Sequence, residues 1–571
     1  MSTLIDIQGL NVAFPGHQAV SGLDLRIAAG ETLALVGESG CGKSTTALAL
    51  LGLLPRHARA SGRILFEGRD LLALTERQRC ALRGDRIAMI FQEPMTSLNP
   101  VLTLGQQIGE ALRLHRGASA QAARQRAIEL LDLVRVPEPQ RRVDDYPHLL
   151  SGGQRQRAMI AAAIACEPAL LVADEPTTAL DVTVQAQILR LLDDLRSELG
   201  MGLLLITHDL AVVGDWADRV AVMVGGEKVE EGAAATLLSR PRHAYTQGLL
   251  GASLRLDDAT HYRQRRLPEI RSRLDPASGR PVFGLVTPPR VAAANDATAG
   301  DPHPLPLMQV RDLRVDYATR QGAKHAVDGV SFQIAPGETL GLVGESGCGK
   351  STLSRTLVRL LAPAAGQILL RGQDTARLDR RGLAAYRQSV QMIFQDPYAS
   401  LNPRHTVNDI LESALRIHHV ADRQERRRRI AHMLDAVGLP HGALARYPSE
   451  FSAGQRQRIG IARALVLRPS LVICDEPVSA LDVSVQAQIL NLLVDLKAEF
   501  NLSYLFISHD LSVVHYLADR VLVMHAGRIV EEGPNATLWR EARHPYTRSL
   551  IEALPRGLDG EGEGETLRRR A

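Results

Sequence analysis

Short apolar runs alternate with helical patterns along this chain, and the runs show no alternation between apolar and polar positions. Four of them lie at residues 169–173, 203–206, 471–474 and 504–507. Strands of this composition are buried on both faces, as in a parallel sheet that helices cover. The pattern therefore predicts an α/β fold.

Two longer segments, at about residues 100–150 and 403–450, have helical patterns and are rich in arginine. Each is predicted to form a helical lobe inserted into an α/β core. The 571 residues are expected to form about four compact units, at roughly 150 residues per domain, which agrees with two cores and two lobes. The four arginines at 426–429 are expected on a solvated helix face, with a membrane surface or a partner as the alternative contact.

An internal repeat covers almost the whole chain. The string LALVGESGCGKST at 33–45 returns as LGLVGESGCGKST at 340–352, and DVTVQAQIL at 181–189 returns as DVSVQAQIL at 482–490. Between them, IFQEPMTSLNP at 90–100 returns as IFQDPYASLNP at 393–403. The shared order of the strings indicates that one domain was duplicated.

The repeat sets the expected domain boundaries. The first domain takes residues 1–252 and the second takes residues 306–555. Residues 253–305 are expected to form an extension of the first domain and a proline-rich linker. We expect the stretch around Leu267 to pack on the first domain, and residues 556–571 to be disordered.

Composition excludes several classes of protein. With 45% hydrophobic and 23% charged residues, the chain is neither mostly disordered nor a coiled-coil rod. No uncharged apolar stretch reaches the ~18 residues that a membrane helix needs, and we expect no secretory leader. The net charge of +4 is small and only 4% of the residues are aromatic, so no nucleic-acid partner is expected. Five scattered cysteines without a Cys-x-x-Cys pair indicate a reducing compartment without disulfides.

Both copies contain the P-loop pattern G-x-x-x-x-G-K-S directly after an apolar run. Its glycines let backbone N–H groups surround the β- and γ-phosphates at a helix N-terminus. Lys43 and Lys350 would add positive charge, and Ser44 and Ser351 would offer hydroxyls to Mg²⁺. The loop residues expected around ATP are Gly37, Glu38, Ser39, Gly40, Cys41, Gly42, Lys43, Ser44 and Thr45, and Gly344, Glu345, Ser346, Gly347, Cys348, Gly349, Lys350, Ser351 and Thr352.

Two adjacent carboxylates end a buried strand in each copy. Asp174 and Asp475 would hold Mg²⁺, and Glu175 and Glu476 are placed to polarise an attacking water. The chemistry that these residues predict is in-line phosphoryl transfer, where positioning and charge neutralisation supply most of the catalysis.

The strings LSGGQ at 150–154 and FSAGQ at 451–455 resemble the signature of ATP-binding-cassette (ABC) ATPases. The Q-, D- and H-loops of that family correspond to Gln92 and Gln395, Asp181 and Asp482, and His208 and His509. The resemblance covers nearly the entire chain. It implies two P-loop ABC cassettes, each a RecA-like α/β core with a β-subdomain and an inserted helical subdomain.

The resemblance implies that the cassettes pair head to tail within the chain, with each ATP between one P-loop and the opposite signature. The signature residues at the nucleotide would be Ser151, Gly152, Gly153 and Gln154, and Ser452, Ala453, Gly454 and Gln455, while Phe14 and Tyr317 would stack on adenine. The implied catalytic residues are Glu175, Glu476, His208, His509, Gln92 and Gln395. The implied Mg²⁺ ligands are Ser44, Gln92 and Asp174 in one site, and Ser351, Gln395 and Asp475 in the other.

Ala453 departs from the family pattern, which has glycine there. A Cβ at this position matters only if the backbone needs a positive φ or the phosphate approaches very closely. Because Ser452, Gly454 and Gln455 persist, and both glutamates and both histidines are present, two hydrolytic sites are expected.

A finer resemblance is to the ATPases of bacterial importers for oligopeptides, dipeptides, glutathione, microcins or nickel. The strings that carry it are QEPMTSLNP at 92–100, VQAQIL in both copies and RHPYT at 543–547, with a weaker echo, RHAYT, at 242–246. It implies an energy-coupling ATPase at the cytoplasmic face of the bacterial inner membrane. Its partners would be two integral-membrane permeases and an extracytoplasmic substrate-binding protein.

Some relatives carry an iron–sulfur cluster on cysteines after the first cassette. This linker has no cysteine, so that cofactor is not expected. Tandem cassettes also occur in ribosome-associated translation factors, whose linker is usually long, charged and helical, and DNA-repair ABC ATPases carry zinc cysteines or coiled coils. Neither feature is present here, and the sequence leaves the cargo of the importer open.

Overall fold

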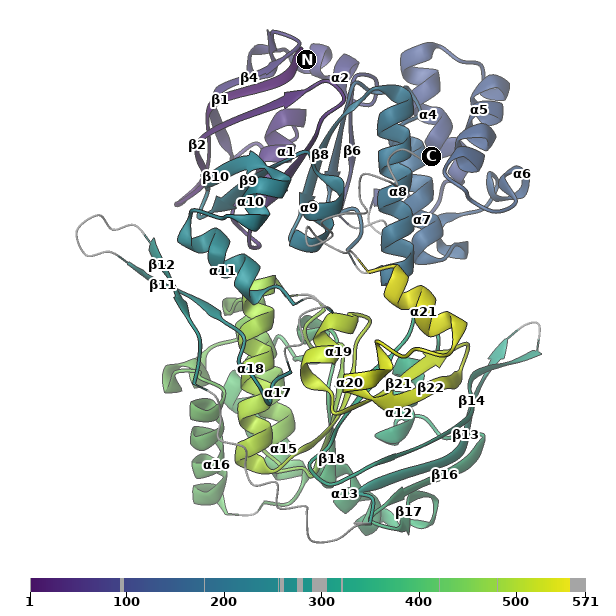
Figure 1. Cartoon of the computed structure of the whole chain (residues 1–571), viewed down its shortest axis with the longest axis vertical. Coiled ribbons are helices and arrows are strands. Elements are labelled where there is room, and N and C mark those ends of the chain that lie inside the picture. The colour runs from purple at the N-terminus through teal and green to yellow at the C-terminus, as the bar shows by residue number, and fades with distance from the viewer. Residues whose placement is uncertain are drawn as a thin grey trace.

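Each copy of the repeat folds into two sheets and a set of helices, and the copies lie one above the other in Figure 1. The computed structural model describes residues 2–92, 97–178, 180–254, 256, 261–274, 281–289, 305–319, 322–420, 422–479 and 481–554. The expected disordered tail lies outside these residues. None of the helices in these ranges combines the length and hydrophobicity needed to cross a bilayer.

An antiparallel sheet starts each cassette. In the first it has the order β2-β1-β4-β5, with β1 Thr3–Phe14, β2 His17–Ala28, β4 Arg59–Phe66 and β5 Arg69–Asp70. In the second the order is β14-β13-β16-β17, with β13 Met308–Thr319, β14 Gly322–Ile334, β16 Ala365–Leu370 and β17 Gln373–Asp374. Apolar residues of these strands pack onto the P-loop helices α1 (Lys43–Leu51) and α12 (Lys350–Leu357).

A six-stranded sheet forms the core of each cassette. The first has the order β10-β9-β3-β8-β7-β6, with β3 Thr32–Val36, β6 Ile87–Ile90, β7 Leu170–Asp174, β8 Gly202–Thr207, β9 Arg219–Val224 and β10 Glu227–Ala233. The second has the order β18-β19-β20-β15-β21-β22, with β15 Thr339–Val343, β18 Val390–Ile393, β19 Leu471–Asp475, β20 Ser503–Ile507, β21 Arg520–His525 and β22 Arg528–Pro534. Among the described strands of these two sheets, only β10 and β22 run antiparallel to their neighbours.

The four apolar runs predicted as buried strands are β7, β8, β19 and β20, and every residue in them is buried. Helices complete the core in both copies. They are α2 Glu76–Leu82, α7 Gly152–Ala163, α8 Val182–Leu199, α9 Leu210–Trp216, α10 Ala234–Ser239 and α11 Ala244–Ala252, and α13 Arg380–Ser389, α14 Pro397–Ser400, α17 Ala453–Leu465, α18 Val483–Phe500, α19 Leu511–Leu517, α20 Asn535–Leu538 and α21 Pro545–Glu552.

The two helical lobes are present where the sequence predicts them. They contain α4 Leu104–Arg116, α5 Ala120–Leu133 and α6 Pro139–Arg142, and α15 Val407–Ile417 and α16 Arg423–Ala436. Of the four arginines at 426–429, which lie on α16, Arg427 and Arg428 are exposed. Arg426 and Arg429 are half-buried and pair with Glu412 and Glu425. The solvated face is therefore confirmed for only part of this run.

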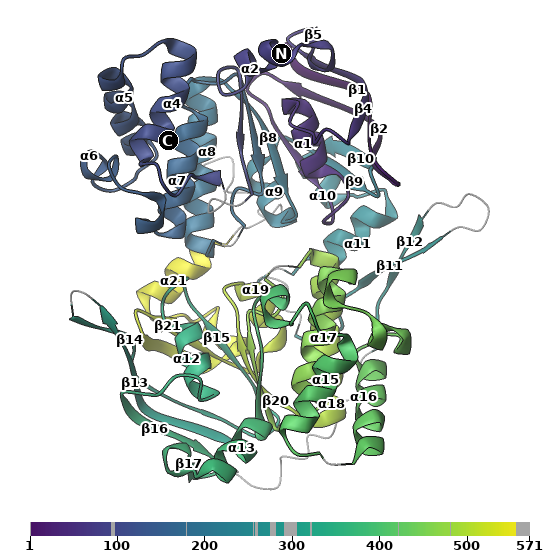
Figure 2. The ribbon, with the colours of Figure 1, turned by 180° about the vertical axis from the view of Figure 1, so that it is seen from behind.

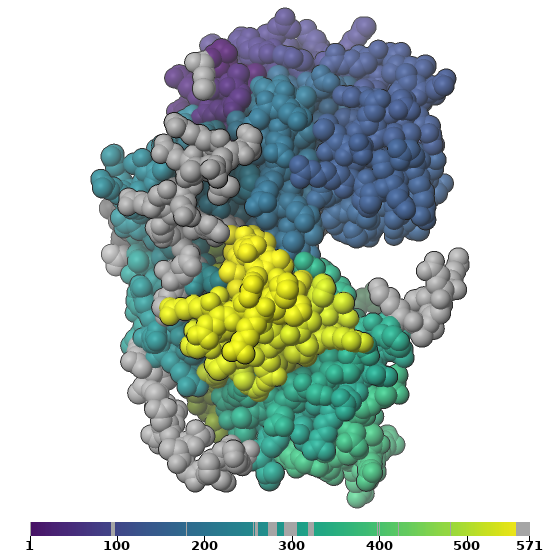
Figure 3. Space-filling view, turned by 45° about the vertical axis from the view of Figure 1, so that its right-hand side comes forward, coloured from purple at the N-terminus to yellow at the C-terminus, as the bar shows by residue number. Residues whose placement is uncertain are grey.

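The cassettes are arranged head to tail. In Figure 1 the helical lobe of the first cassette lies on the right and that of the second on the left, and Figure 2 shows the same relation from behind. Helix α11 contacts α18, and α21 contacts α8, so each C-terminal helix reaches the opposite cassette. Figure 3 shows the molecule hollowed between the first helical lobe and the second cassette.

A strap, residues 261–271, crosses from the first cassette to the second and runs into the hairpin of β11 (Glu269–Leu274) and β12 (Pro281–Val286). Leu267 lies in the hydrophobic core of the second cassette, whereas Ile270 packs with the first. The prediction that the stretch around Leu267 packs on the first domain is therefore wrong for Leu267. The backbone of the strap explains why: the side chain of Asn491 pairs with both the N–H and the C=O of Leu267, at 3.2 and 2.9 Å.

Candidate functional site

The P-loops have a backbone that only glycine permits. Gly37 and Gly42 have φ values of 153° and 101°, and a Cβ on them would meet the carbonyl oxygens of Met223 and Ala19 at 2.2 and 2.5 Å. Gly344 and Gly349 repeat this geometry in the second copy. The loop can therefore turn its N–H groups to one side and start α1 or α12 with the lysine.

Both P-loop lysines are buried and bonded to their own loop. Lys43 Nζ donates to the carbonyl oxygens of Gly37 and Glu38 at 2.7 and 2.9 Å. Lys350 makes the same two bonds in its loop, at 2.6 and 2.8 Å. Both ammonium groups are thereby directed at the loop in which phosphates would bind.

A hydroxyl and a carboxylate lie together beside each loop. Ser44 Oγ is 3.1 Å from Asp174 Oδ1, and Ser351 Oγ is 3.4 Å from Asp475 Oδ1. Burial raises the pKa of Asp174 and of Asp475, although hydrogen bonds from the serines oppose this. The donor set is all oxygen, which fits Mg²⁺ that keeps water and phosphate in its remaining positions. Ser354, where the first copy has Ala47, adds a second hydroxyl on Asp475.

The second carboxylates are held at the end of the core strands by strained backbone. Glu175 and Glu476 both have a φ of 48°, unusual for a residue with a side chain. The amide of Gln92 donates to Glu175 at 2.9 Å, and that of Gln395 donates to Glu476 at 2.8 Å. Both glutamines are therefore bonded to the glutamates, and among the described residues neither makes a hydrogen bond to Asp174 or Asp475, the expected Mg²⁺ ligands.

Each glutamate also pairs with the histidine of its own cassette. His208 Nδ1 lies 3.5 Å from Glu175, and His509 Nδ1 lies 3.1 Å from Glu476. Burial alone would raise the pKa of Glu175, but the hydrogen bond and charge of His208 and the hydroxyl of Thr178 outweigh it and lower the pKa to about 2. The pKa of His208 and of His509 is raised by the same pairing, against the opposing effect of burial. These glutamates are thus ionised acceptors at neutral pH.

The signature residues begin helices α7 and α17. Ser151 and Ser452 cap these helices by accepting from the N–H of Gln154 and Gln455, each at 3.3 Å. At Gly152 the φ is not positive, and a Cβ would meet only Leu180 at 3.9 Å. This open space explains why the second copy accommodates Ala453 at the equivalent position.

The next glycine of each signature has no such space. A Cβ on Gly153 would meet Val184 Cγ1 at 2.8 Å, and one on Gly454 would meet Val485 Cγ1 at 2.5 Å. Close packing onto α8 and α18 therefore requires glycine at these two positions.

The cassettes meet through a D-loop and a P-loop. The N–H of Ser39 donates to Asp482 at 2.8 Å, and Ser484 donates to the carboxylate of Glu38. Among the described residues no hydrogen bond joins Ser346 to Asp181, which is the equivalent pair. Nor does any hydrogen bond join a signature serine to the opposite P-loop lysine in this part of the chain. The nucleotide sites implied by the family are therefore assembled only in part.

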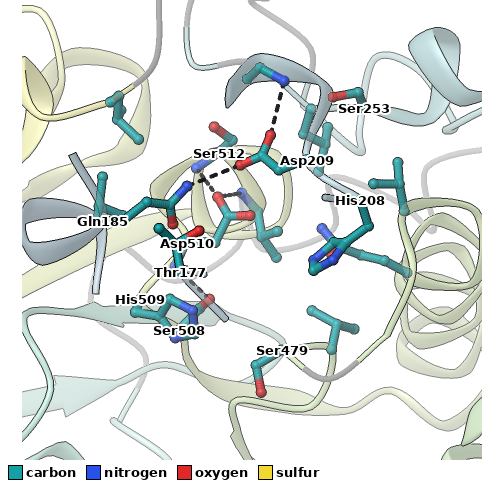
Figure 4. A pocket seen from close by; sticks show the side chains of 18 of the residues that line it. Thr177, Gln185, His208, Asp209, Ser253, Ser479, Ser508, His509, Asp510 and Ser512 are labelled. Atoms are coloured by element: carbon teal, nitrogen blue, oxygen red, sulfur yellow. Dashed lines mark hydrogen bonds between the residues drawn. The ribbon is translucent and has the colours of Figure 1, made fainter. Parts of the chain in front are cut away.

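A cavity of about 580 Å³ lies between the two cassettes. Figure 4 shows that His208 and Asp209 of the first cassette face the same space as His509 and Asp510 of the second. The two H-loop histidines thus open onto one shared space between the cassettes.

The two aromatic residues expected at adenine differ in their surroundings. Tyr317 is 41% exposed, and its hydroxyl lies 3.4 Å from Thr352 of the second P-loop. Phe14 is half-buried, and its ring centroid lies 5.8 Å from that of His57. Each cysteine of the P-loops is buried, as are Cys166 and Cys474.

Sequence reasoning missed two groups of residues at these sites. One group is Thr178 and Ser484, whose hydroxyls donate to the carboxylates of Glu175 and Glu38. The other is Tyr245 with Tyr546, whose hydroxyls accept from the P-loops. The tyrosines lie in the repeated strings RHAYT and RHPYT, so their repetition was a signal that could have assigned them a role.

Two protein families match this chain, each in both cassettes. The family "ABC transporter" matches residues 20–178 and 327–479. The family "Oligopeptide/dipeptide transporter, C-terminal region" matches residues 229–280 and 530–570. A solved structure of cbiO1 from Clostridium perfringens aligns with a TM-score of 0.39 and 27% identity, over 46% of this chain and 99% of that one.

Two curated relatives match over nearly the full length. The glutathione import ATP-binding protein GsiA of Salmonella typhimurium is 48% identical, and that of Escherichia coli K12 is 46% identical. Each alignment covers 97% of this chain and 89% of the relative. None of these matches supports a ribosome-associated factor. The chain belongs to the ABC transporter family, as an ATP-hydrolysing subunit of the oligopeptide/dipeptide type.

Proposed function

We propose that this chain hydrolyses two ATP molecules between its cassettes and thereby drives the import of glutathione or a related peptide. The observation that carries the proposal is the constellation of glutamine, glutamate and histidine, which occurs twice with the same bonds. Both copies have an ionised glutamate beside a P-loop, so both have the parts that in-line attack by water requires.

Each ATP would lie between one P-loop and the opposite signature. Lys43 would exchange its two loop carbonyls for phosphate oxygens, and Ser452, Ala453, Gly454 and Gln455 would close on the same nucleotide. Lys350 would bind the second nucleotide in the same way, opposite Ser151, Gly152, Gly153 and Gln154. Phe14 and Tyr317 would stack on the adenines.

Hydrolysis would follow from groups that the fold already positions. Ser44 with Asp174, and Ser351 with Asp475, would hold Mg²⁺, whose charge offsets the charge that develops on the phosphates. Glu175 and Glu476 would orient and polarise the attacking water. His208 and His509 would turn from the glutamates to the γ-phosphate, which would also free the glutamates to accept a proton from water.

Exposed aromatic residues support two permease partners. Phe91 and Phe394, which precede the Q-loop glutamines, are 40% and 37% exposed. Tyr146 and Tyr447, which precede the signatures, are 40% and 45% exposed. Apolar side chains at equivalent places on two cassettes fit one helix from each of two membrane proteins. The chain would then lie at the cytoplasmic face of the inner membrane, and an extracytoplasmic protein would deliver the cargo.

The relatives named above import glutathione, which makes glutathione the first cargo to test. A dipeptide, a longer peptide or a microcin-like peptide would be the next, and a nickel or other metal chelate is the least favoured. A specificity pocket for any of these would belong to the permeases and the binding protein.

The first experiment measures ATP hydrolysis and glutathione uptake with the same variant. ATP hydrolysis by the purified chain should fall at least about a hundredfold in the variant with both Lys43→Ala and Lys350→Ala, since both phosphate clamps are lost. Cells with this variant should also lose uptake of labelled glutathione. Turnover that survives both substitutions would overturn the assignment of the sites.

A photo-crosslinking amino acid at Tyr146 or Tyr447 should capture two different polytopic membrane proteins. A crosslinker at Leu360 is the control and should capture neither protein. Leu360 is 60% exposed and is not one of the aromatic residues proposed to contact the permeases. Capture of ribosomal proteins instead would overturn the transport function while leaving the ATPase chemistry in place.

A further inference from the structure

A backbone N–H of each P-loop is hydrogen-bonded to a tyrosine from the C-terminal part of the same cassette. The N–H of Glu38 donates to the hydroxyl of Tyr245 at 3.1 Å, and the N–H of Glu345 donates to that of Tyr546 at 2.9 Å. Tyr245 is completely buried, at 0% exposure. The two partners of the first bond are 207 residues apart in sequence, and those of the second are 201 apart.

The repeated string around each tyrosine explains how its ring is aimed. His243 caps α11 by accepting from the N–H of Tyr245 at 3.2 Å, and Glu230 on β10 accepts from the N–H of His243 at 3.1 Å. In the second copy, His544 and Glu531 make the same two bonds at the start of α21. The histidine and glutamate thus fix the first turn of the helix, and that turn fixes the tyrosine.

Glu38 connects this tyrosine to the phosphate-binding lysine. Its N–H is held by Tyr245, and its carbonyl oxygen accepts from Lys43 Nζ at 2.9 Å. Its carboxylate receives the hydroxyl of Ser484 from the other cassette. In the second copy, the N–H of Glu345 bonds Tyr546 and its carbonyl oxygen bonds Lys350 at 2.8 Å. One residue of each loop therefore carries the tyrosine bond and the lysine bond together.

A backbone N–H in this position has few alternatives. A Cβ on its neighbour Gly37 would lie 2.2 Å from the carbonyl oxygen of Met223, so the loop packs closely there and has little room to turn the N–H of Glu38 towards water. Without the tyrosine hydroxyl, this donor would be buried and unsatisfied, or the loop would shift and displace the carbonyl that holds the lysine. Either change would lower the affinity of the P-loop for phosphate.

We propose that Tyr245 and Tyr546 are positioning residues that fix the first turn of each P-loop and thereby set the affinity of the chain for ATP. This inference rests on the proposed nucleotide sites. The tyrosines do not touch nucleotide in this proposal. They act through Glu38 and Glu345, so their loss weakens the binding of phosphate in the ground state and the transition state alike.

The test is the full-length chain with Tyr245→Phe and Tyr546→Phe, which removes two hydroxyls and leaves the rings in place. We expect the KM for ATP and the Kd for a fluorescent ATP analogue to rise about three- to tenfold, with kcat within about twofold of the parent. Tyr504→Phe is the matched control, because its buried hydroxyl bonds the carbonyl of Leu493 at 2.9 Å away from both loops. It should leave KM unchanged.

A merely structural role would have a different signature. Loss of folded protein lowers kcat at constant KM, and this result, or an unchanged KM, would overturn the inference. If the double variant is recovered in low yield, the single variants decide: each should weaken binding of the analogue at one of two sites and leave the other at parental affinity. Equal parental affinity at both sites in both single variants would also overturn it.

The variant with Lys43→Ala and Lys350→Ala separates this inference from the function on which it rests. If that variant binds the analogue as the parent does, the nucleotide sites themselves are wrong. If it loses binding while both tyrosine variants keep parental affinity, the sites stand and only the role of the tyrosines fails.

Discussion

The N–H of Ser39 in the first P-loop donates to the carboxylate of Asp482 in the second cassette at 2.8 Å. The two residues are 443 positions apart in sequence, and the equivalent residues, Ser346 and Asp181, are not bonded among the described residues. On that side the hydroxyl of Thr183, which corresponds to Ser484, is buried and has no hydrogen-bond partner in the described part of the chain. The first P-loop is therefore hydrogen-bonded to the opposite D-loop, whereas within the described ranges the second P-loop is not.

This difference predicts unequal protection of the two P-loops. Without nucleotide, Asp482→Ala should speed hydrogen exchange of the amides in segment 33–45 about tenfold, because the Ser39 bond is lost. Asp181→Ala is the matched control and should leave exchange in segment 340–352 unchanged. Equal effects of the two substitutions in hydrogen-exchange mass spectrometry would show that the loops are held alike.

Both sites are predicted to hydrolyse ATP. Glu175→Gln and Glu476→Gln keep the shape of each side chain and remove the acceptor for the proton of water. Each single variant should lower steady-state phosphate release, and the double variant should abolish it to below about 1% of the parent. Abolition by Glu175→Gln together with no effect of Glu476→Gln would mean that only one site turns over.

The pairing of His509 with Glu476 predicts a pH-dependent stability. Because the pKa of His509 is raised above 6.5, its contribution is complete below that pH and is lost as the pH rises through the raised value. Because the pKa of Glu476 is lowered below 4.5, its contribution is present above that pH and is lost as the pH falls through the lowered value. The pair therefore stabilises most between pH 4.5 and 6.5.

His509→Gln should accordingly lower the Tm by about 2–4 °C near pH 6, for a loss of about 1 kcal/mol, and by less above about pH 8. The control is His441→Gln, which removes an exposed pair with Asp435 and should shift the Tm little at any pH. Scanning calorimetry across this range measures both. A Tm difference for His509→Gln that does not change with pH would contradict the pairing.

The two glycines of the first signature should differ in their tolerance of a methyl group. Gly153→Ala should lower the free energy of unfolding by about 1–3 kcal/mol, because its Cβ would meet Val184 at 2.8 Å. Gly152→Ala should change it by no more than about 0.5 kcal/mol, since the nearest atom is 3.9 Å away. Urea titration gives both values. Equal losses would show that the backbone of the signature, rather than its packing on α8, requires glycine.

The strap is predicted to depend on Asn491, which the first cassette replaces with Arg190. Asn491→Arg removes both side-chain bonds to the backbone of Leu267 and crowds Arg266, which is 2% exposed beside Asp495. Cleavage by trypsin between residues 253 and 305 should become at least about tenfold faster, because the local opening costs less free energy. Arg190→Asn, on the exposed equivalent face, should leave the rate unchanged. An unchanged rate in Asn491→Arg would show that the strap is held elsewhere.

The parallel core strands, the helical lobes and the chemistry of the P-loops could be predicted from the sequence because each rests on local constraints. Buried strands need unbroken apolar runs, and the P-loop needs glycine where Gly37 has a φ of 153° and no room for a Cβ. His208 and Glu175 both belong to the ABC motifs, so the sequence could assign both of them to one site. Such features depend on short segments of sequence, so they can be recognised before the fold is known.

Contacts between distant elements were decided only by the tertiary structure. Spacing gives no sign that Tyr245 reaches Glu38, or that Leu267 leaves its own cassette for Asn491. In the sequence, Asn491 and its counterpart Arg190 look like an ordinary difference between two surface positions. What separates them is the packing of whole helices across the interface, because a hydrogen bond forms only where the fold brings two groups within about 3 Å. The sequence determined the chemistry of both sites, whereas tertiary packing decided which P-loop is bonded to the opposite cassette.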